Sequence, residues 1–194
     1  MTDIKKPLHK LPVCLQGVPV NENDYPNFWA MITSGATIPA EYREGGSQMG
    51  MLFEGYLFRC AKTFVTKYEL GAWNYFYCKR GGQLFYLTPT WAKDVVLIDN
   101  ILTDKDLDSQ AFGFYITLYA LNQYRYVAKE THWANVYAKM IEWAKRQLSD
   151  AQGLEYGVFS TDEDTEESKR VREAITIIDN ITLSKPQTLK SIAA

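Results

Sequence analysis

Apolar residues recur at helical spacing in several parts of the chain and predict most of its helices. The longest such run, residues 47–68, places Phe53, Leu57 and Phe64 on one side and stops before Gly71. A shorter helix is predicted from Asp24, with a proline in its first turn, to just before Gly35. A last helix is predicted from near residue 168, with its apolar positions between residues 171 and 181.

Two further helical stretches differ in how their apolar residues are distributed. Residues 109–122 are apolar on almost every side, so this helix is predicted to be buried, with Ser109 as its N-cap. Residues 133–148 carry a single apolar stripe. Polar residues fill the other side of that helix: Asn135, Lys139, Glu142, Lys145 and Arg146. The second stretch is therefore predicted to be an amphipathic helix on the surface.

Between these helices the apolar period changes to two, which indicates strands. Residues 73–78 and 83–89 predict a hairpin that turns at Gly81-Gly82, and residues 94–99 predict a third strand. The expected fold class is α+β, with a small antiparallel sheet, made of the aromatic hairpin plus the third strand, packed with several helices. Residues 1–20 contain three prolines and predict an extended N-terminal arm, residues 21–185 a single domain, and residues 186–194 a loose tail.

Charge and composition exclude several classes of function. The 194 residues carry a net charge of −2 and the pI is about 5.7, which is too low for a general electrostatic nucleic-acid binder. The same charge is too small for imitation of DNA phosphate. No apolar run reaches the length of a membrane span, and the N-terminus has no apolar signal core. The three cysteines are far apart in the sequence, which does not indicate a disulfide framework. We therefore expect a cytoplasmic protein without a membrane contact.

The residues that carry catalytic or metal chemistry are few. The two histidines are His9, in the arm that we expect to be mobile, and His132, at the start of a helix. Cys60 and Cys78 fall on predicted core positions, and Cys14 is the one cysteine expected to be exposed. The acidic run at residues 162–167 lacks the central glycine of a calcium loop and fits a solvated helix N-terminus. No catalytic, cofactor-binding or metal-binding residue is predicted, and no enzyme activity is expected.

The most distinctive element is the aromatic hairpin. Trp73, Tyr75 and Tyr77 share one face of its first strand, and Lys79 and Arg80 lie at its turn. These rings fit the core of the protein, but they also fit an exposed surface that binds a partner or stacks on bases. The five residues are the candidate partner-binding site.

Three stretches together resemble a known family, the antirestriction proteins of the ArdB/KlcA type carried by plasmids and phages. The first is a tyrosine, a glycine and an aromatic strand. The second is a Gly-Gly, aromatic, apolar, Pro pattern. The third is an acidic residue, a small residue and a glycine, followed by a helix that ends Leu-x-Ala-Leu-Asn. In this sequence they are KYELGAWNYFY at residues 67–77, GGQLFYLTP at residues 81–89 and LDSQAFGFYITLYALN at residues 107–122. The likeness covers about residues 49–148 and does not extend to the N-terminal arm or to residues 151–167.

The resemblance implies a compact α+β domain that relieves type I restriction of incoming plasmid or phage DNA. The implied partner is the type I restriction enzyme or a host factor that controls it, and direct DNA binding is not expected. Two other classes of function remain as alternatives. A single-stranded nucleic-acid binder, or another partner-binding module of a mobile element, would expose Trp73 or Tyr75 on an open sheet face beside the basic turn. An enzyme would place Cys78 or His132 in a deep pocket beside a carboxylate.

Overall fold

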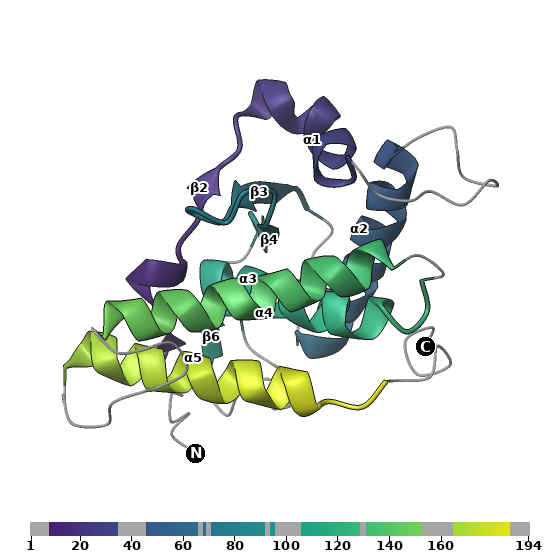
Figure 1. Ribbon diagram of the computed structural model, residues 1–194. Helices are drawn as coiled ribbons and strands as arrows, with labels where there is room; N and C mark the ends of the chain where they lie inside the picture. Colours follow the sequence, from purple (N-terminus) through teal and green to yellow (C-terminus); the bar gives the residue numbers. More distant parts are fainter. Residues whose placement is uncertain are drawn as a thin grey trace, which may run out of the picture.

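The structure is a computed structural model that describes residues 8–34, 46–65, 68, 71–91, 94–95, 106–128, 131–152 and 165–186. Within these residues the chain forms five α-helices and two three-stranded sheets, which confirms the predicted α+β class (Figure 1). The helices are α1 (Tyr25–Ile32), α2 (Gly46–Phe64), α3 (Ser109–Tyr124), α4 (His132–Ala151) and α5 (Glu166–Leu183). The strands are β1 (Leu8–His9), β2 (Val18–Pro19), β3 (Trp73–Tyr77), β4 (Phe85–Pro89), β5 (Asp94–Val95) and β6 (Asp106–Asp108). Two 3-10 turns, η1 (Val13–Leu15) and η2 (Glu22–Asp24), complete the N-terminal part.

The predicted hairpin is β3 and β4, paired antiparallel from Trp73 opposite Pro89 to Tyr77 opposite Phe85. Its third strand is not the predicted one. β2 from the N-terminal part pairs antiparallel with β3, and Pro19 is tolerated there because β2 is the edge of the sheet. β5 lies where the third strand was predicted but pairs with β6, which also pairs in parallel with β1. Residues 96–99 of the predicted strand lie outside the described residues.

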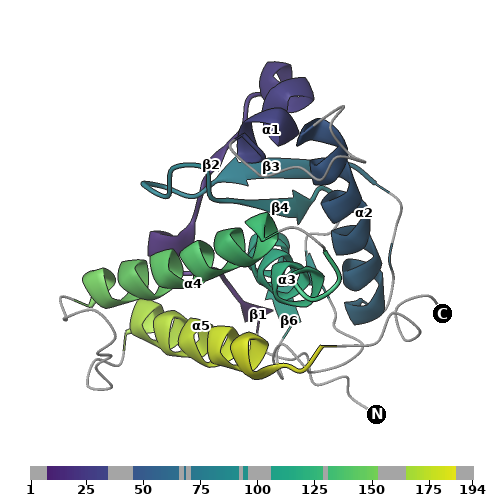
Figure 2. The same ribbon diagram turned by 45° about the vertical axis from the view of Figure 1, so that its right-hand side comes forward.

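Helix α3 is the core of the protein, as its apolar sequence predicts. Every residue from Ala111 to Gln123 is buried, and the helix packs against β4, α2, α4 and α5 (Figures 1 and 2). Its N-cap is Asp108 rather than the predicted Ser109, because the Asp108 carboxylate accepts a hydrogen bond from the Ala111 amide at 2.7 Å.

A glycine allows α3 to approach the hairpin sheet closely. A Cβ atom on Gly113 would lie 2.3 Å from the carbonyl oxygen of Leu87 in β4. One turn further along α3, the Thr117 hydroxyl donates to the Gly113 carbonyl at 2.7 Å and accepts from the Leu87 amide at 3.2 Å. Because β4 is an edge strand, this hydroxyl satisfies a backbone amide that no neighbouring strand pairs.

The N-terminal segment is packed into the core, so His9 does not lie in a mobile arm. The imidazole of His9 is enclosed, with Nδ1 at 2.6 Å from a Glu173 carboxylate oxygen and Nε2 at 2.9 Å from the Tyr115 hydroxyl. Leu11 and Leu15 are almost fully buried in the same hydrophobic cluster as α3. The prolines of this segment predicted an arm without regular structure. Its strands β1 and β2 are only two residues long, so they leave no periodic pattern from which the packing could be predicted. Residues 1–7 lie outside the described residues.

The C-terminal part follows the prediction where it is described. Thr165 caps α5 by accepting from the Ser168 amide at 3.1 Å, and Glu166 and Glu167 lie in its first turn. Glu167 also accepts a hydrogen bond from the Val13 amide at 2.7 Å, which ties η1 to α5. Residues 162–164 of the acidic run, and the predicted tail beyond Pro186, lie outside the described residues. Within the described part, no helix is both long and apolar enough to cross a bilayer.

The close approach at Gly113 predicts a strong effect of a single methyl group. Gly113→Ala should lower the free energy of unfolding by about 3 kcal/mol, because the methyl meets backbone atoms that no side-chain rotation can move aside. The matched control is Gly55→Ala in α2, where a Cβ meets nothing within 4 Å and should raise stability by about 0.5 to 1 kcal/mol. Urea unfolding of both variants measures this, and equal stabilities would contradict the assigned packing of α3 on β4.

The contacts of His9 predict that the N-terminal segment contributes to stability. His9→Ala should cost about 2 to 3 kcal/mol, because it leaves the buried Tyr115 hydroxyl without this partner. Tyr115→Phe should cost less, and the double variant should lose less than the sum of the two single losses. Thermal or urea unfolding of the four proteins gives the coupling. Strictly additive losses would mean that the His9 and Tyr115 contact contributes nothing.

Candidate functional site

The structure divides the five candidate residues between the core and the surface. Trp73 is buried and stacks on Phe58 of α2, with ring centroids 5.0 Å apart. Tyr75 is half-buried beneath α1, 4.6 Å from the ring of Phe28, and its hydroxyl donates to the Glu54 carboxylate at 2.5 Å. The aromatic face of β3 therefore packs against α1 and α2.

Tyr77 continues this packing at the other end of β3. Its ring lies 5.6 Å from Phe28, and its hydroxyl lies 3.9 Å from the sulfur of Met31 in α1. The rings of Trp73, Tyr75 and Tyr77 thus do not form an open platform for bases, which counts against the single-strand-binding alternative at this face.

The two basic candidates lie on the surface at the hairpin turn. Lys79 and Arg80 are exposed, and three backbone hydrogen bonds close the turn between Cys78 and Leu84. The Lys79 carbonyl accepts a hydrogen bond from Nε1 of Trp143 at 2.9 Å. This bond holds the turn against α4, which begins more than fifty residues later in the sequence.

The backbone of Arg80 is in an unusual conformation for an arginine. Its φ is +57°, in the left-handed region that costs a non-glycine residue about 1 kcal/mol. Gly82 in the same turn has a φ of +63°, as expected for glycine. The turn therefore keeps a long basic side chain at a position where glycine would be more stable.

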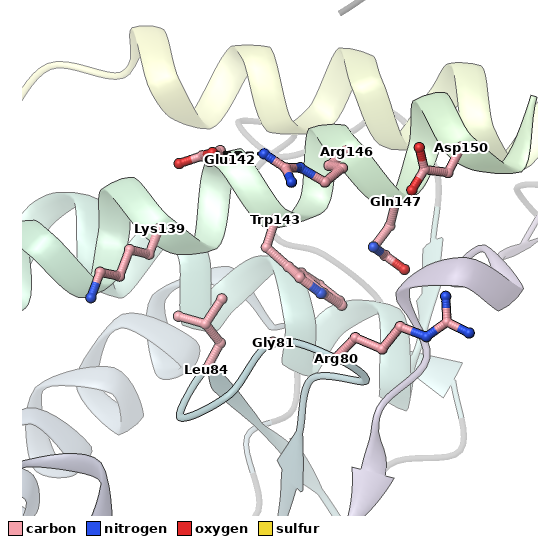
Figure 3. Close-up of a pocket in the computed structure, with 9 residues that line it drawn as sticks. All are labelled: Arg80, Gly81, Leu84, Lys139, Glu142, Trp143, Arg146, Gln147 and Asp150. Carbon is pink, nitrogen blue, oxygen red and sulfur yellow. Dashed lines mark hydrogen bonds and ion pairs between the residues drawn. The ribbon is translucent and has the colours of Figure 1, made fainter. Parts of the chain in front are cut away.

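Two hollows lie on either side of this turn, between it and α4, and we call them together the turn groove. One has a volume of about 450 Å³ and the other about 390 Å³, and both are bordered by Gly81, Leu84 and Lys139. The larger hollow is drawn in Figure 3. Its remaining lining residues are Arg80, Glu142, Trp143, Arg146, Gln147 and Asp150.

The charges around the turn groove are not all neutralised. Arg146 pairs with Glu142 at 3.1 Å along α4. In contrast, the side chains of Arg80 and Lys139 make no ion pair or hydrogen bond with any of the described residues. In Figure 3, Trp143 projects from α4 toward the turn, with Lys139 on one side of its ring and Arg80 on the other. The groove therefore offers two cations that no described residue neutralises, on either side of a largely buried indole.

Sequence reasoning found Lys79 and Arg80 but missed the α4 half of the groove. Lys139, Glu142 and Arg146 were interpreted only as the solvated side of a surface helix. One signal was present in the sequence: Trp143 is a large aromatic residue beside those charges, outside the apolar stripe that predicted the helix. Without the fold, nothing in the sequence links it to the hairpin turn.

The smaller hollow also contains His132, one of the two residues that an enzyme would use. Its other polar side chains are Ser34, Gln83, Asn135 and Lys139, and none of its described lining residues is a carboxylate. Cys78 is 3% exposed and borders neither hollow. The arrangement expected of a nucleophilic enzyme, a thiol or imidazole beside a carboxylate in a pocket, is therefore not found among the residues that the structure describes.

Burial makes all three thiols poor nucleophiles. It raises the pKa of Cys60 to about 12 and, with a further contribution from Glu167, the pKa of Cys14 to about 11. Burial also raises the pKa of Cys78. Cys14 was expected to be exposed, and it is half-buried instead.

These shifts predict slow thiol chemistry with a defined pH dependence. At pH 8 Cys14 should react about a hundredfold more slowly with a thiol reagent than a thiol of the unfolded chain, and Cys60 and Cys78 should react more slowly still, because only the thiolate reacts. The rate at Cys14 should continue to rise until the pH approaches 11. Stopped-flow modification of the wild type and of Cys14→Ser measures this. A native thiol that reacts at pH 7 as fast as free cysteine would contradict the pKa assignments and favour a nucleophilic role.

Comparison with known proteins adds no assignment to this geometry. No protein-family model matches the sequence. No curated protein matches it either.

Proposed function

We propose that this protein is an antirestriction protein that relieves type I restriction of incoming plasmid or phage DNA by binding a protein. The partner is the type I restriction enzyme itself or a host factor that controls it. The choice of biological process comes from the three stretches that resemble the ArdB/KlcA type. The proposal places the protein in the cytoplasm, where restriction of incoming DNA takes place.

The observation that supports a binding mechanism is the turn groove. It joins two elements through the hydrogen bond from Trp143 to the Lys79 carbonyl, and it leaves Arg80 and Lys139 without partners among the described residues. Tryptophan and arginine are the residues that most often dominate protein interfaces. A groove that holds both residues, with arginine in a backbone conformation that favours glycine, has the features of a recognition surface.

Mimicry of DNA by charge is disfavoured as the mechanism. A net charge of −2 over 194 residues cannot reproduce the field of the phosphate backbone, and the turn groove carries two cations, Arg80 and Lys139, that no described residue neutralises. Single-stranded nucleic-acid binding remains the alternative function, and the aromatic packing of β3 against α1 speaks against its most direct form. We also propose that the protein is not an enzyme, consistent with the high pKa of its thiols.

The test is the efficiency of plating of unmodified phage on hosts with and without a type I restriction enzyme. Expression of the wild-type protein should raise plating on the restricting host and leave the non-restricting host unchanged. The variant Arg80→Gly with Lys139→Gln should lose most of this effect, although glycine suits the backbone at residue 80. Lys62→Gln, on the exposed end of α2, is the matched control and should keep full activity.

Two results would count against the proposal, at different levels. Equal plating with and without well-expressed wild-type protein would remove the antirestriction function. Full activity of the folded double variant would leave that function in place but would remove the turn groove as the contact surface.

A further inference from the structure

We infer that the turn groove binds an acidic, extended segment of the partner protein, with carboxylates paired to Arg80 and Lys139 and an apolar side chain against Trp143. This inference rests on the proposed function in taking the partner to be a protein. It goes further by naming the chemistry that the groove recognises.

The two cations determine the charge of the ligand. Arg80 and Lys139 are exposed and come from different elements, and neither has an ion pair or hydrogen bond among the described residues. The other charged pair of the groove, Arg146 with Glu142, is already neutralised at 3.1 Å. Another cation of α4, Lys145, is paired with Asp179 of α5. Among these cations of α4, Lys139 in the groove is thus the one that no described carboxylate neutralises.

The conformation of Arg80 supports a role for its side chain. A residue with a φ of +57° is more stable as glycine, and the turn already uses glycine at residues 81 and 82. An arginine at residue 80 therefore costs stability at the turn. A guanidinium group that binds a carboxylate through two parallel hydrogen bonds is a physical reason to keep it there.

The groove between the cations fits a peptide better than a small anion. Trp143 and Leu84 are each 7% exposed and form an apolar floor, and the indole nitrogen is already used by the turn. The amide side chains of Asn135 and Gln147 border the groove and have no hydrogen bond to a described residue. Such amides can pair with the N–H and C=O groups of an extended backbone.

Asp150 argues against a nucleic acid as the occupant. This carboxylate lines the same hollow as Arg80, and in Figure 3 it lies at the Gln147 end of the groove. A nucleic acid carries a negative charge at every nucleotide, so a strand along the hollow would bring successive phosphates past both Asp150 and Glu142, whereas a peptide needs only one carboxylate for each cation.

The test is a selection of short random peptides displayed against the purified full-length chain. Peptides recovered on the wild type should be enriched in Asp and Glu next to a large apolar residue. The enrichment should disappear on the charge-reversed variant Arg80→Glu with Lys139→Glu and should persist on the control Lys62→Glu. In fluorescence anisotropy, a selected peptide should bind about tenfold more weakly to each of Arg80→Gly and Lys139→Gln than to the wild type.

The alternative occupants give different results, and each would overturn the inference. Recovery without acidic enrichment, or equal enrichment on the charge-reversed variant, would mean that the cations do not select the ligand. Tighter binding of an oligothymidylate than of the selected peptide at the same salt would identify a nucleic-acid site. A wild-type dimer that dissociates on charge reversal would identify a second copy of this chain. None of these results depends on phage plating, so a failure here is distinct from a failure of the antirestriction proposal.

Discussion

The structure depends on one helix that is buried on every side. Because α3 has no solvated face, β4, α2, α4 and α5 all have to pack around it, and its closest contact is the approach of Gly113 to the Leu87 carbonyl. Any side chain larger than hydrogen at residue 113 would move the hairpin sheet away from the helix. The position of the hairpin turn relative to α4 follows from this packing, since β4 and α4 both contact α3.

The turn groove is a consequence of that arrangement. The sheet brings the hairpin turn to α4, and the hydrogen bond from Trp143 to the Lys79 carbonyl fixes the distance between them. The cations Arg80 and Lys139 then lie on two different elements, on either side of an apolar floor. Because the hydrogen bond already joins these two elements, binding a partner would need to order only the two long side chains. The same packing places the rings of Tyr75 and Tyr77 against Phe28 of α1, so that they hold β3 of the hairpin against this helix.

Local pattern was enough to predict the helices, the hairpin and the α+β class. A period of 3.6 identified α2, α4 and α5, and the lack of a polar side identified α3 as the core. The N-terminal segment was not predictable in this way, because Val18 pairs with Tyr77 and His9 contacts Tyr115 and Glu173, all distant in sequence. For the same reason Arg80 could be selected from the sequence, whereas its pairing with Lys139 and Trp143 required the fold.

We propose that partner binding is concentrated at the turn groove. A substitution scan of exposed side chains, scored for relief of type I restriction at equal levels of folded protein, tests it most directly. Activity should fall on substitution of Arg80 and Lys139. It should be unchanged on substitution of Lys10, Asn74 and Thr90, which border a separate hollow near the start of α3. Loss of activity at those three residues, with none at Arg80 and Lys139, would contradict it.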